Sequence, residues 1–496
     1  MSTYRIHTRD NVAVAVEDLK AGETLNIEDV QLICRSEIPR GHKFALRSIE
    51  AGSSIIKYGY PIGTALQNIE AGDHIHVHNL KTSLSGTLEY DYEPVDSRLQ
   101  AAESRSFMGF PRPDGKAGTR NEVWIIPISG CVNRTTQMLA QSGLPLPENV
   151  EGIHAFPHPY GCSQLGDDHE HTRSILAGLA EHPNAGAVLL IGLGCENNQM
   201  DSFIELLKER GSWNDERIRW MVTQDVEDEL ETGRELLKRC ISYAAGFRRR
   251  ELPSSRLVVG LKCGGSDGLS GLTANPLVGA FSDDLIAQGG STILTEVPEM
   301  FGAETILMNR AADHNVYGKI VSLINSFKEY FLRHNQTVYE NPSPGNKKGG
   351  ISTLEDKSLG CTQKSGDAPV ADVIRYGQVL KTPGLNLLQG PGNDIVSVTA
   401  LAAAGAQIIL FTTGRGNPLG SPVPTVKIAS NNDLAVRKAH WIDFSAGDLV
   451  SKPGTLMETL RKDLMGVVLD HASGKRTRNE EHGYREIAIF KDGVIL

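Results

Sequence analysis

Four short apolar runs in this chain each end in a turn that carries a cysteine beside glycine, and this repeated construction constrains the fold most. In Leu257–Pro276 the apolar run reaches Cys263, and the sequence GGSDG follows it. The other three turns hold Cys131, Cys162 and Cys195. Such runs have the length and branching of buried strands. A single cysteine in such a turn is often only a small buried hydrophobe. Four of them favour a shared polar site, because ligands bind at the carboxyl ends of strands in open α/β sheets.

The size and composition of the chain exclude several classes of protein. A chain of 496 residues should hold roughly two to four domains, because single hydrophobic cores stop growing at about 250–300 residues. The net charge of −10 argues against nucleic acid as a partner. No apolar run approaches the roughly 20 residues that span a bilayer, and the N-terminus lacks the apolar core of a signal peptide. We therefore expect a cytoplasmic protein with no membrane partner. The seven cysteines indicate thiols or metal ligands, since an odd number does not fit a disulfide framework.

The pattern along the chain predicts a small β domain followed by α/β domains. In residues 1–92 short runs alternate with glycine turns, which is typical of a barrel-like or clip-like module. Residues 93–110 lack regular apolar spacing and are predicted to be a linker. Residues 111–250 and 251–496 alternate strand-like and helical runs, which predicts α/β domains with largely parallel sheets. Residues 340–366 are polar and are predicted to be a long functional loop.

Several polar side chains in these segments are candidates for a site. His74, His76 and His78 alternate, so on a strand they would share one face, either as metal ligands or as a hydrated edge. Arg415 lies in a glycine-flanked turn and suits a carboxylate, although a structural arginine is an equal alternative. The glycines near it do not make a complete dinucleotide fingerprint, so no NAD is expected. The polar segment 340–366 could grip a polyhydroxy acid or be a mobile linker.

Longer motifs resemble the altronate/galactarate dehydratase family over nearly the whole chain. DNVAVA, IPRGHKFAL, IKYGYPIG and HVHN are similar to the N-terminal SAF, or β-clip, module of these enzymes. YGCSQLGDD, GLGCENNQ, CGGSDGLSGLTANP, TEVPEMFGAE, ENPSPGNKKGG, LEDKSLGCTQK and TGRGNPLG are similar to their catalytic region. The resemblance implies dehydration of D-altronate to 2-dehydro-3-deoxy-D-gluconate in hexuronate catabolism, with iron as the usual metal. HIHVHN and GCTQK are more similar to the altronate branch than to the galactarate branch.

The chemistry of this reaction suggests roles for the candidate residues. The C2 proton of a 2,3-dihydroxy acid is very weakly acidic, so a metal or cationic clamp must stabilise the enediolate dianion. A base removes this proton and an acid protonates the leaving C3 hydroxyl. The candidates for proton transfer are His42, Lys43, His158 and Lys347. The candidates for substrate binding are Asn11, Ser266, Asp267, Asn346, Lys348 and Arg415.

Two arrangements of the metal remain open. In the first, Fe²⁺ (or Mn²⁺) acts as a Lewis acid among mixed ligands drawn from His42, His76, His78, His158, His169, Glu196 and Asp267. In the second, Cys131, Cys162, Cys195 and Cys263 supply thiolates, which suit an iron–sulfur cluster. From these two arrangements together, we select as candidate metal ligands Cys162, Cys195, Cys263, His76, His78 and Glu196.

Three further expectations concern function and assembly. The N-terminal domain is expected to close over the site, and Cys162, Cys195 and Cys263 are expected in one pocket or its supporting shell. The partner is a small sugar acid, and a homo-oligomer is left open. Galactarate dehydratase, another sugar-acid dehydratase, or a sugar-acid-binding protein without chemistry are the alternatives, and product formation separates the binder from the enzymes.

Overall fold

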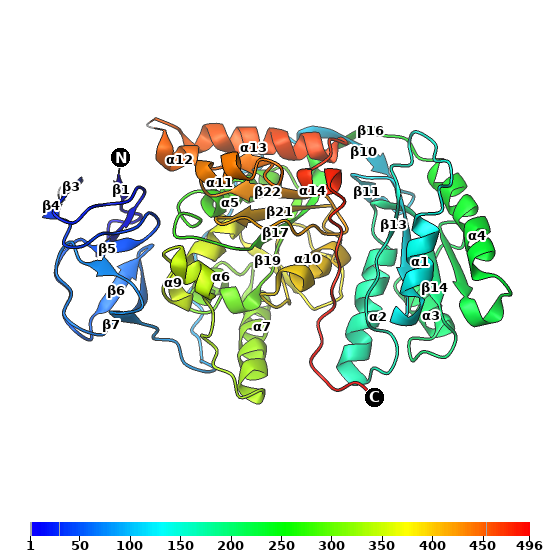
Figure 1. Ribbon diagram of the computed structural model, residues 1–496, viewed down its shortest axis with the longest axis horizontal. Coiled ribbons are helices and arrows are strands. Elements are labelled where there is room, and N and C mark those ends of the chain that lie inside the picture. The colour runs from blue at the N-terminus through cyan, green and yellow to red at the C-terminus, as the bar shows by residue number, and fades with distance from the viewer. Residues whose placement is uncertain (1, 29, 453) are drawn as a thin grey trace.

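The computed structural model describes residues 2–28, 30–452 and 454–496, which form three parts (Figure 1). The N-terminal part is built only from strands, in three small antiparallel sheets. The first sheet contains β1 (Thr3–Tyr4), β2 (Val12–Ala15), β5 (Lys43–Ala45) and β8 (His74–Ile75). The second contains β3 (Thr24–Ile27) and β4 (Val30–Ile33), and the third contains β6 (Ser54–Lys57), β7 (Tyr60–Ala65) and β9 (Leu80–Lys81). Alternate residues of β3 are buried, as a half-covered strand requires.

The second part contains a four-stranded parallel sheet of order β13-β12-β14-β15 (right side of Figure 1). Its strands are β12 (Glu122–Pro127), β13 (Ile153–Ala155), β14 (Ala185–Gly192) and β15 (Ile218–Val222). Its helices are α1 (Asn133–Ala140), α2 (Gly166–Ala180), α3 (Met200–Glu209) and α4 (Glu229–Ala244). Every residue of β14 is buried because helices cover both faces of the sheet. A small sheet lies between this part and the central part described next. It contains β10 (Ser106–Pro111), β11 (Ala117–Gly118) and β16 (Arg250–Pro253).

The central part contains a seven-stranded parallel sheet of order β19-β20-β18-β17-β21-β22-β23. The strands are β17 (Val258–Cys263), β18 (Ser291–Leu294), β19 (Val370–Ile374), β20 (Leu385–Leu388), β21 (Ile408–Thr413), β22 (Thr425–Ala429) and β23 (Phe444–Ser445). The longer helices around it are α5 (Ala274–Ala287), α7 (His314–Arg333), α10 (Asp394–Ala403) and α13 (Met457–Ala472). The shorter ones are α6 (Glu304–Met308), α8 (Pro344–Lys348), α9 (Leu354–Thr362), α11 (Asn432–Arg437), α12 (Asp448–Ser451) and α14 (Arg478–Glu481). β17 lies at the middle of the sheet, so Cys263 ends a central strand.

The prediction of a small β domain followed by α/β parts with parallel sheets is confirmed. Three local predictions differ from the structure. Residues 106–110 belong to β10 and not to a linker, and the strand that carries His74 ends at Ile75. The predicted loop 340–366 contains α8 and α9. All of α9 is buried, including Glu355, Asp356 and Lys357, so it lacks the single apolar face by which a helix is recognised.

Buried ion pairs attach the N-terminal part to the central part. Lys43 Nζ lies 2.8 Å from Asp356 Oδ2, and Lys57 Nζ lies 2.9 Å from Asp356 Oδ1. The three side chains are at most 2% exposed. The C-terminal end of the chain runs from the central part to the second part. There Ile495 forms an isolated antiparallel β-bridge with Gln164. Among the described residues, no helix is long and apolar enough to cross a membrane.

Candidate functional site

A polar cavity of about 290 Å³ lies where the N-terminal part meets the central part. Its lining includes Asp267, Lys348 and Arg415, which are three of the six predicted substrate-binding residues. The cationic side chains of Arg40 and Arg437 also line it. Arg40 is paired with Asp433, whereas Lys348 and Arg415 have exposed side chains. The cavity therefore offers positive charge to an anion.

Hydrogen bonds hold Asp267 at the wall of this cavity. Its Oδ1 accepts from the Ser270 amide at 2.9 Å and the Ser430 hydroxyl at 2.9 Å, and its Oδ2 accepts from Asn431 Nδ2 at 3.1 Å. The facing turn must be glycine at Gly414, because a Cβ there would lie 2.2 Å from Asp267 Cγ. The carboxylate of Asp267 is thus fixed in position before a ligand arrives.

Helix α8 connects the cavity to two clusters of reactive side chains. Its N-terminus is closed by a capping box in which the Ser343 hydroxyl and the Asn346 side chain satisfy each other's backbone amides. Asn346 is buried, donates to the Ser266 carbonyl at 2.8 Å and accepts from Lys357 Nζ at 3.2 Å. Ser266 Oγ is buried and has no hydrogen-bond partner among the described residues. Lys348, two residues after Asn346, lines the cavity.

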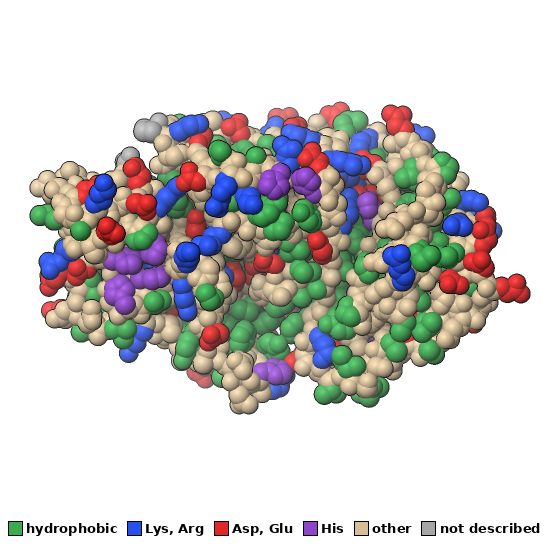
Figure 2. All heavy atoms as spheres, viewed as in Figure 1, with side chains coloured by type: hydrophobic (Ala, Val, Ile, Leu, Met, Phe, Trp, Pro, Cys, Tyr) green, Lys and Arg blue, Asp and Glu red, His purple; other side chains and the backbone are tan. Residues whose placement is uncertain are grey.

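The first cluster consists of four imidazoles on the N-terminal part (Figure 2). His42 Nδ1 lies 3.0 Å from His74 Nε2, and His42 Nε2 lies 3.3 Å from the Lys348 carbonyl. The ring centroids of His74 lie 5.7 Å from His76 and 5.4 Å from His78. The strand ends at Ile75, but a turn in which the amides of Asn79 and Leu80 donate to the His76 carbonyl keeps the rings together.

The electrostatics of this cluster favour neutral imidazoles. Burial, and then the positive charge that neighbouring imidazoles would carry, lower the pKa of His74 to about 3. Burial and the nearby ammonium of Lys43 lower the pKa of His76 to about 4. The Nδ1 atom of His76 is buried and has no hydrogen-bond partner among the described residues. Neutral imidazole is the form that binds metal ions.

The second cluster surrounds Cys263 at the end of β17. Its sulfur lies 3.4 Å from the Cys361 sulfur and 3.3 Å from Glu299 Oε2, and Cys361 Sγ lies 3.2 Å from the same oxygen. These three side chains are buried and form a group that could hold a metal ion. Lys357 Nζ lies 2.8 Å from Glu299 Oε1. A Glu296 carboxylate, held by Lys262 and Lys364, borders the same group.

Three buried ammonium groups control the charge of this thiol cluster. The hydrogen bond between the sulfurs lowers the pKa of Cys263 to about 6 and raises the pKa of Cys361 well above its usual value. Burial opposes ionisation of Glu299, but Lys357, Lys262 and Lys364 outweigh it and lower its pKa to about 2. The three ammonium groups therefore surround the ionised Glu299 carboxylate and the Cys263 thiol of lowered pKa.

Several predicted site residues serve the fold instead of the cavity. Lys43 is buried and paired with Asp356, and Asn11 uses its amide to bind the backbone of Ser54 and Ile56. His158 donates from Nε2 to the Pro127 carbonyl at 2.7 Å and accepts the Tyr160 amide at Nδ1. Glu196 braces its own turn by accepting the amides of Leu193 and Gly194. These contacts leave the four side chains with structural partners.

The three cysteines that were expected to share a pocket follow strands of two different sheets. Cys162 and Cys195 follow β13 and β14 of the four-stranded sheet, whereas Cys263 ends β17 and has Cys361 as its thiol neighbour. Lys347 lies in α8 and is half-buried.

Sequence reasoning did not select Cys361, Glu299, Lys357 or Lys364 as site residues. Cys361, Lys357 and Lys364 lie in residues 340–366, which were predicted to be a loop. The predicted fold therefore did not place these residues near Cys263. Lys262 offered a signal, because a lysine inside an otherwise apolar central strand requires a buried partner.

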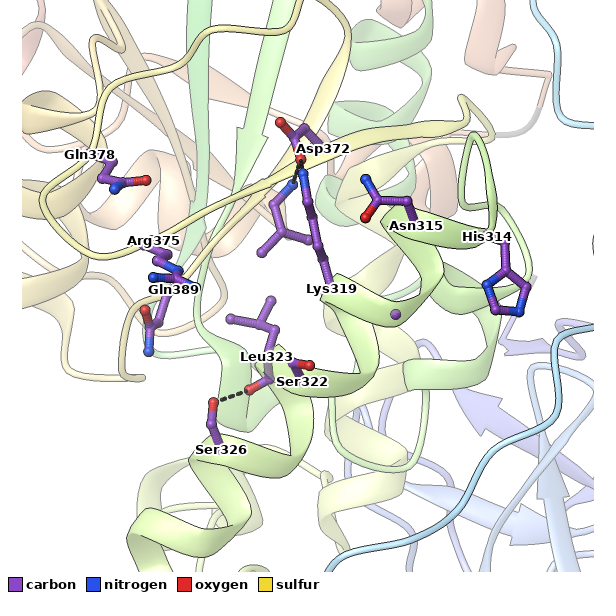
Figure 3. Close-up of a pocket in the computed structure, with 12 residues that line it drawn as sticks. His314, Asn315, Lys319, Ser322, Leu323, Ser326, Asp372, Arg375, Gln378 and Gln389 are labelled. Atoms are coloured by element: carbon purple, nitrogen blue, oxygen red, sulfur yellow. Dashed lines mark hydrogen bonds and ion pairs between the residues drawn. The ribbon is translucent and has the colours of Figure 1, made fainter.

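A larger groove of about 710 Å³ lies elsewhere, along α7 and β19 (Figure 3). Figure 3 shows Lys319 and Asp372 paired across it, with Arg375, Gln378 and Gln389 on one side. None of the predicted site residues lines this groove. The smaller cavity beside α8 therefore remains the candidate site.

Comparisons with known proteins agree on all three parts of the chain. The profile described as "Altronate/galactarate dehydratase SAF domain" matches residues 1–83. That of "D-galactarate dehydratase/Altronate hydrolase, second domain" matches residues 109–245, and that of "D-galactarate/Altronate dehydratase, C-terminal" matches residues 254–495. The chain is 53% identical to an altronate dehydratase of Bacillus subtilis and 51% identical to one of Escherichia coli, each over all of both chains. It is 33% identical to a galactarate dehydratase (L-threo-forming) of Escherichia coli, over 99% of this chain and 97% of that one.

Proposed function

The chain belongs to the altronate/galactarate dehydratase family, and we propose that it is a hydro-lyase that converts D-altronate to 2-dehydro-3-deoxy-D-gluconate and water. Two relatives that bear the name altronate dehydratase share half of its residues over their full length. The relative that acts on galactarate is more distant, at 33% identity. The degree of identity therefore favours altronate as the substrate, in a pathway of hexuronate breakdown.

The observation that carries this proposal is the cationic cavity beside α8. Lys348 and Arg415 offer an ammonium and a guanidinium to a carboxylate, and a guanidinium binds a carboxylate with two parallel hydrogen bonds. Asp267, Asn431 and backbone groups of the surrounding turns offer acceptors and donors for hydroxyl groups. The cavity of about 290 Å³ is large enough for one six-carbon acid. A monocarboxylate needs one such clamp, whereas galactarate would require a second at its far end.

We place the metal, Fe²⁺ or alternatively Mn²⁺, at the imidazole cluster. The side chains of His74 and His76 suit it, because burial lowers their pKa and favours the neutral imidazole, and His76 Nδ1 has no hydrogen-bond partner among the described residues. The ring of His78 lies beside that of His74. The thiol cluster fits less well, since a cation there would face the ammonium groups of Lys357, Lys262 and Lys364. A divalent cation held there would supply Lewis acidity toward the substrate carboxylate.

The residues of the chain divide the remaining work between binding and proton transfer. Lys348 and Arg415 bind the carboxylate and orient C2 and C3. We assign proton transfer to two of the predicted candidates: His42, which contacts the last residue of α8, and Lys347, which lies within α8. His42 reaches the α8 turn through the Lys348 carbonyl and contacts His74 through its other ring nitrogen. The N-terminal part completes the cavity with Arg40 and Gly41, so it takes part in excluding water.

The localisation that fits this chemistry is the cytoplasm. A reducing compartment keeps Cys263 and Cys361, whose sulfurs lie 3.4 Å apart, as thiols. A small sugar acid is the partner that the cavity suits.

An anaerobic assay with added Fe²⁺ tests the proposal. The purified protein is given D-altronate, galactarate or a buffer control, and the 2-keto acid is detected chemically. We expect product from altronate in large excess over galactarate, and loss of turnover after chelation that Fe²⁺ restores. Binding of altronate without any keto acid would make the protein a binder. Preference for galactarate would assign it to the other branch of the family.

A further inference from the structure

The second part of the chain carries three Gly-Cys turns at one edge of its sheet. Gly130-Cys131 follows β12, Gly161-Cys162 follows β13, and Gly194-Cys195 follows β14. These are three adjacent parallel strands, with β12 between the other two. Cys131 and Cys195 are exposed and Cys162 is half-buried. Neighbouring strands lie roughly 5 Å apart, so their carboxyl ends present three thiols to one small region of surface.

Direct hydrogen bonds tie the three turns together. The Gly130 amide donates to the Tyr160 carbonyl at 2.7 Å, next to the Cys162 turn. The Asn198 amide donates to the Gly161 carbonyl at 3.0 Å, and the Ser163 amide donates to Asn197 Oδ1 at 2.7 Å. Each bond lies within three residues of a cysteine. The thiols are therefore neighbours in space although they are about 30 residues apart in sequence.

Backbone strain at these turns indicates that their shape is required. Ser163 has a φ of +56°, which is uncommon for a residue with a side chain. At Gly161, φ is +96° and a Cβ would lie 2.0 Å from the Ile128 carbonyl oxygen, so only glycine allows the turn of Cys162 to pack on that of Cys131. Packing alone would not require a solvent-accessible cysteine in each of the three turns.

The helix ends at this edge favour an anionic ligand. Helices α1, α2 and α3 each begin within five residues after one of the three cysteines, so the positive ends of three helix dipoles lie at this edge. Two buried amide atoms in the same turns, Gln164 Nε2 and Asn198 Oδ1, have no hydrogen-bond partner among the described residues. A group bound at this edge would give these atoms something to contact.

We propose that Cys131, Cys162 and Cys195 form a binding site for an iron–sulfur cluster, separate from the imidazole and thiol clusters. Thiolate sulfur is the protein ligand that such clusters use, and binding releases the three thiol protons. Three protein ligands leave one iron of a cubane cluster open to an oxygen ligand. The edge borders a cavity of about 500 Å³ that Tyr160 lines together with Pro298 and Asn341 of the central part.

The test is reconstitution of the full chain with Fe²⁺ and sulfide under anaerobic conditions. We expect bound acid-labile sulfide, iron in at least the same amount because the imidazole cluster can hold iron as well, a broad visible absorption band, and an electron paramagnetic resonance signal after reduction. Cys131→Ser, Cys162→Ser and Cys195→Ser should each lower bound sulfide at least several-fold. Cys34→Ser, a buried thiol of the N-terminal part, and Cys361→Ser of the thiol cluster are the controls and should keep it.

Three results would overturn the site. These are the absence of bound sulfide in the reconstituted protein, equal sulfide in the triple serine variant and the parent, and loss of the cluster only when Cys263 or Cys361 is replaced. Circular dichroism of each variant establishes that it is folded. Because the readout is cluster content, the result is independent of whether the protein dehydrates altronate.

Discussion

Replacing the buried carboxylate that joins the N-terminal part to the central part should partly detach the two. Asp356 accepts Lys43 Nζ at 2.8 Å, Lys57 Nζ at 2.9 Å and the Ser352 amide at 3.1 Å. Asp356→Asn keeps the shape of the side chain and removes its charge. Two buried ammonium groups then face each other without a counter-ion, since both lysines are at most 2% exposed.

The expected cost follows from these contacts. Removing one partner from a buried ion pair costs about 3–5 kcal/mol, because the remaining charge stays buried. Two hydrogen bonds to charged groups, at about 1.5–3 kcal/mol each, give a similar total. The cost has a ceiling because Lys43 can lose its proton: burial already lowers its pKa to about 8. We therefore expect Asp356→Asn to lower the free energy of opening between the two parts by about 3–5 kcal/mol.

Hydrogen exchange of the amides in β2 and β5 measures this opening, because unfolding of a three-part chain is not a two-state process. Lys43→Met in the Asp356→Asn background should recover part of the loss, since one unpaired charge is removed. Glu458→Gln, which breaks an exposed ion pair with Lys462, is the control and should leave exchange unchanged. The reasoning is refuted if Asp356→Asn changes exchange by less than about sixfold, which corresponds to roughly 1 kcal/mol.

Three other predictions concern binding, pH and the metal. Arg415→Gln should raise KM for altronate by about 10–100-fold, which corresponds to the loss of one charge-assisted hydrogen bond. Arg375→Gln, in the groove of Figure 3, is the control and should leave KM unchanged. If the Arg415→Gln enzyme and the parent have equal KM values, Arg415 does not bind the substrate carboxylate. Arg120 outweighs burial and lowers the pKa of Glu480 to about 2, so this carboxylate stabilises the fold fully above pH 4.5 and loses about 3 kcal/mol as pH falls toward 2. Glu480→Gln should be less stable at pH 7 but lose less on acidification, as urea titrations at several pH values will show; parallel pH curves would contradict this. His76→Ala should bind less iron by elemental analysis with its fold intact, and full iron content would exclude that imidazole as a ligand.

The architecture could be predicted from the sequence because it depends on local patterns. Apolar runs of strand length that end in glycine turns with a cysteine predicted the strands β12, β13, β14 and β17, because strands of a covered parallel sheet are nearly continuous apolar runs. Helix α9 was missed for the opposite reason. It is buried on all sides and carries charged residues whose partners, such as Lys43 and Glu299, are remote in sequence. Periodicity reports an apolar face and contains no information about buried ion pairs.

The difference between local patterns and contacts remote in sequence also explains which site residues could be predicted from the sequence. Asp267 and Arg415 lie in turns rich in glycine and polar residues, Lys348 ends the short helix α8 directly before Gly349 and Gly350, and all three line one cavity. His158 and Glu196 lie in turns of the same appearance, yet their side chains satisfy backbone groups of those turns. A polar residue after a strand has either an internal partner or an external one, and only the three-dimensional contacts separate the two cases. Cysteine differs in this respect, because a thiol is too weak a hydrogen-bond partner to brace a turn. The thiols of Cys131 and Cys195 are exposed, and among the described residues neither sulfur braces a backbone group as Glu196 does; Cys195 Sγ accepts only a long contact of 3.7 Å from Gln224 Nε2. They are therefore the better indication of an external ligand.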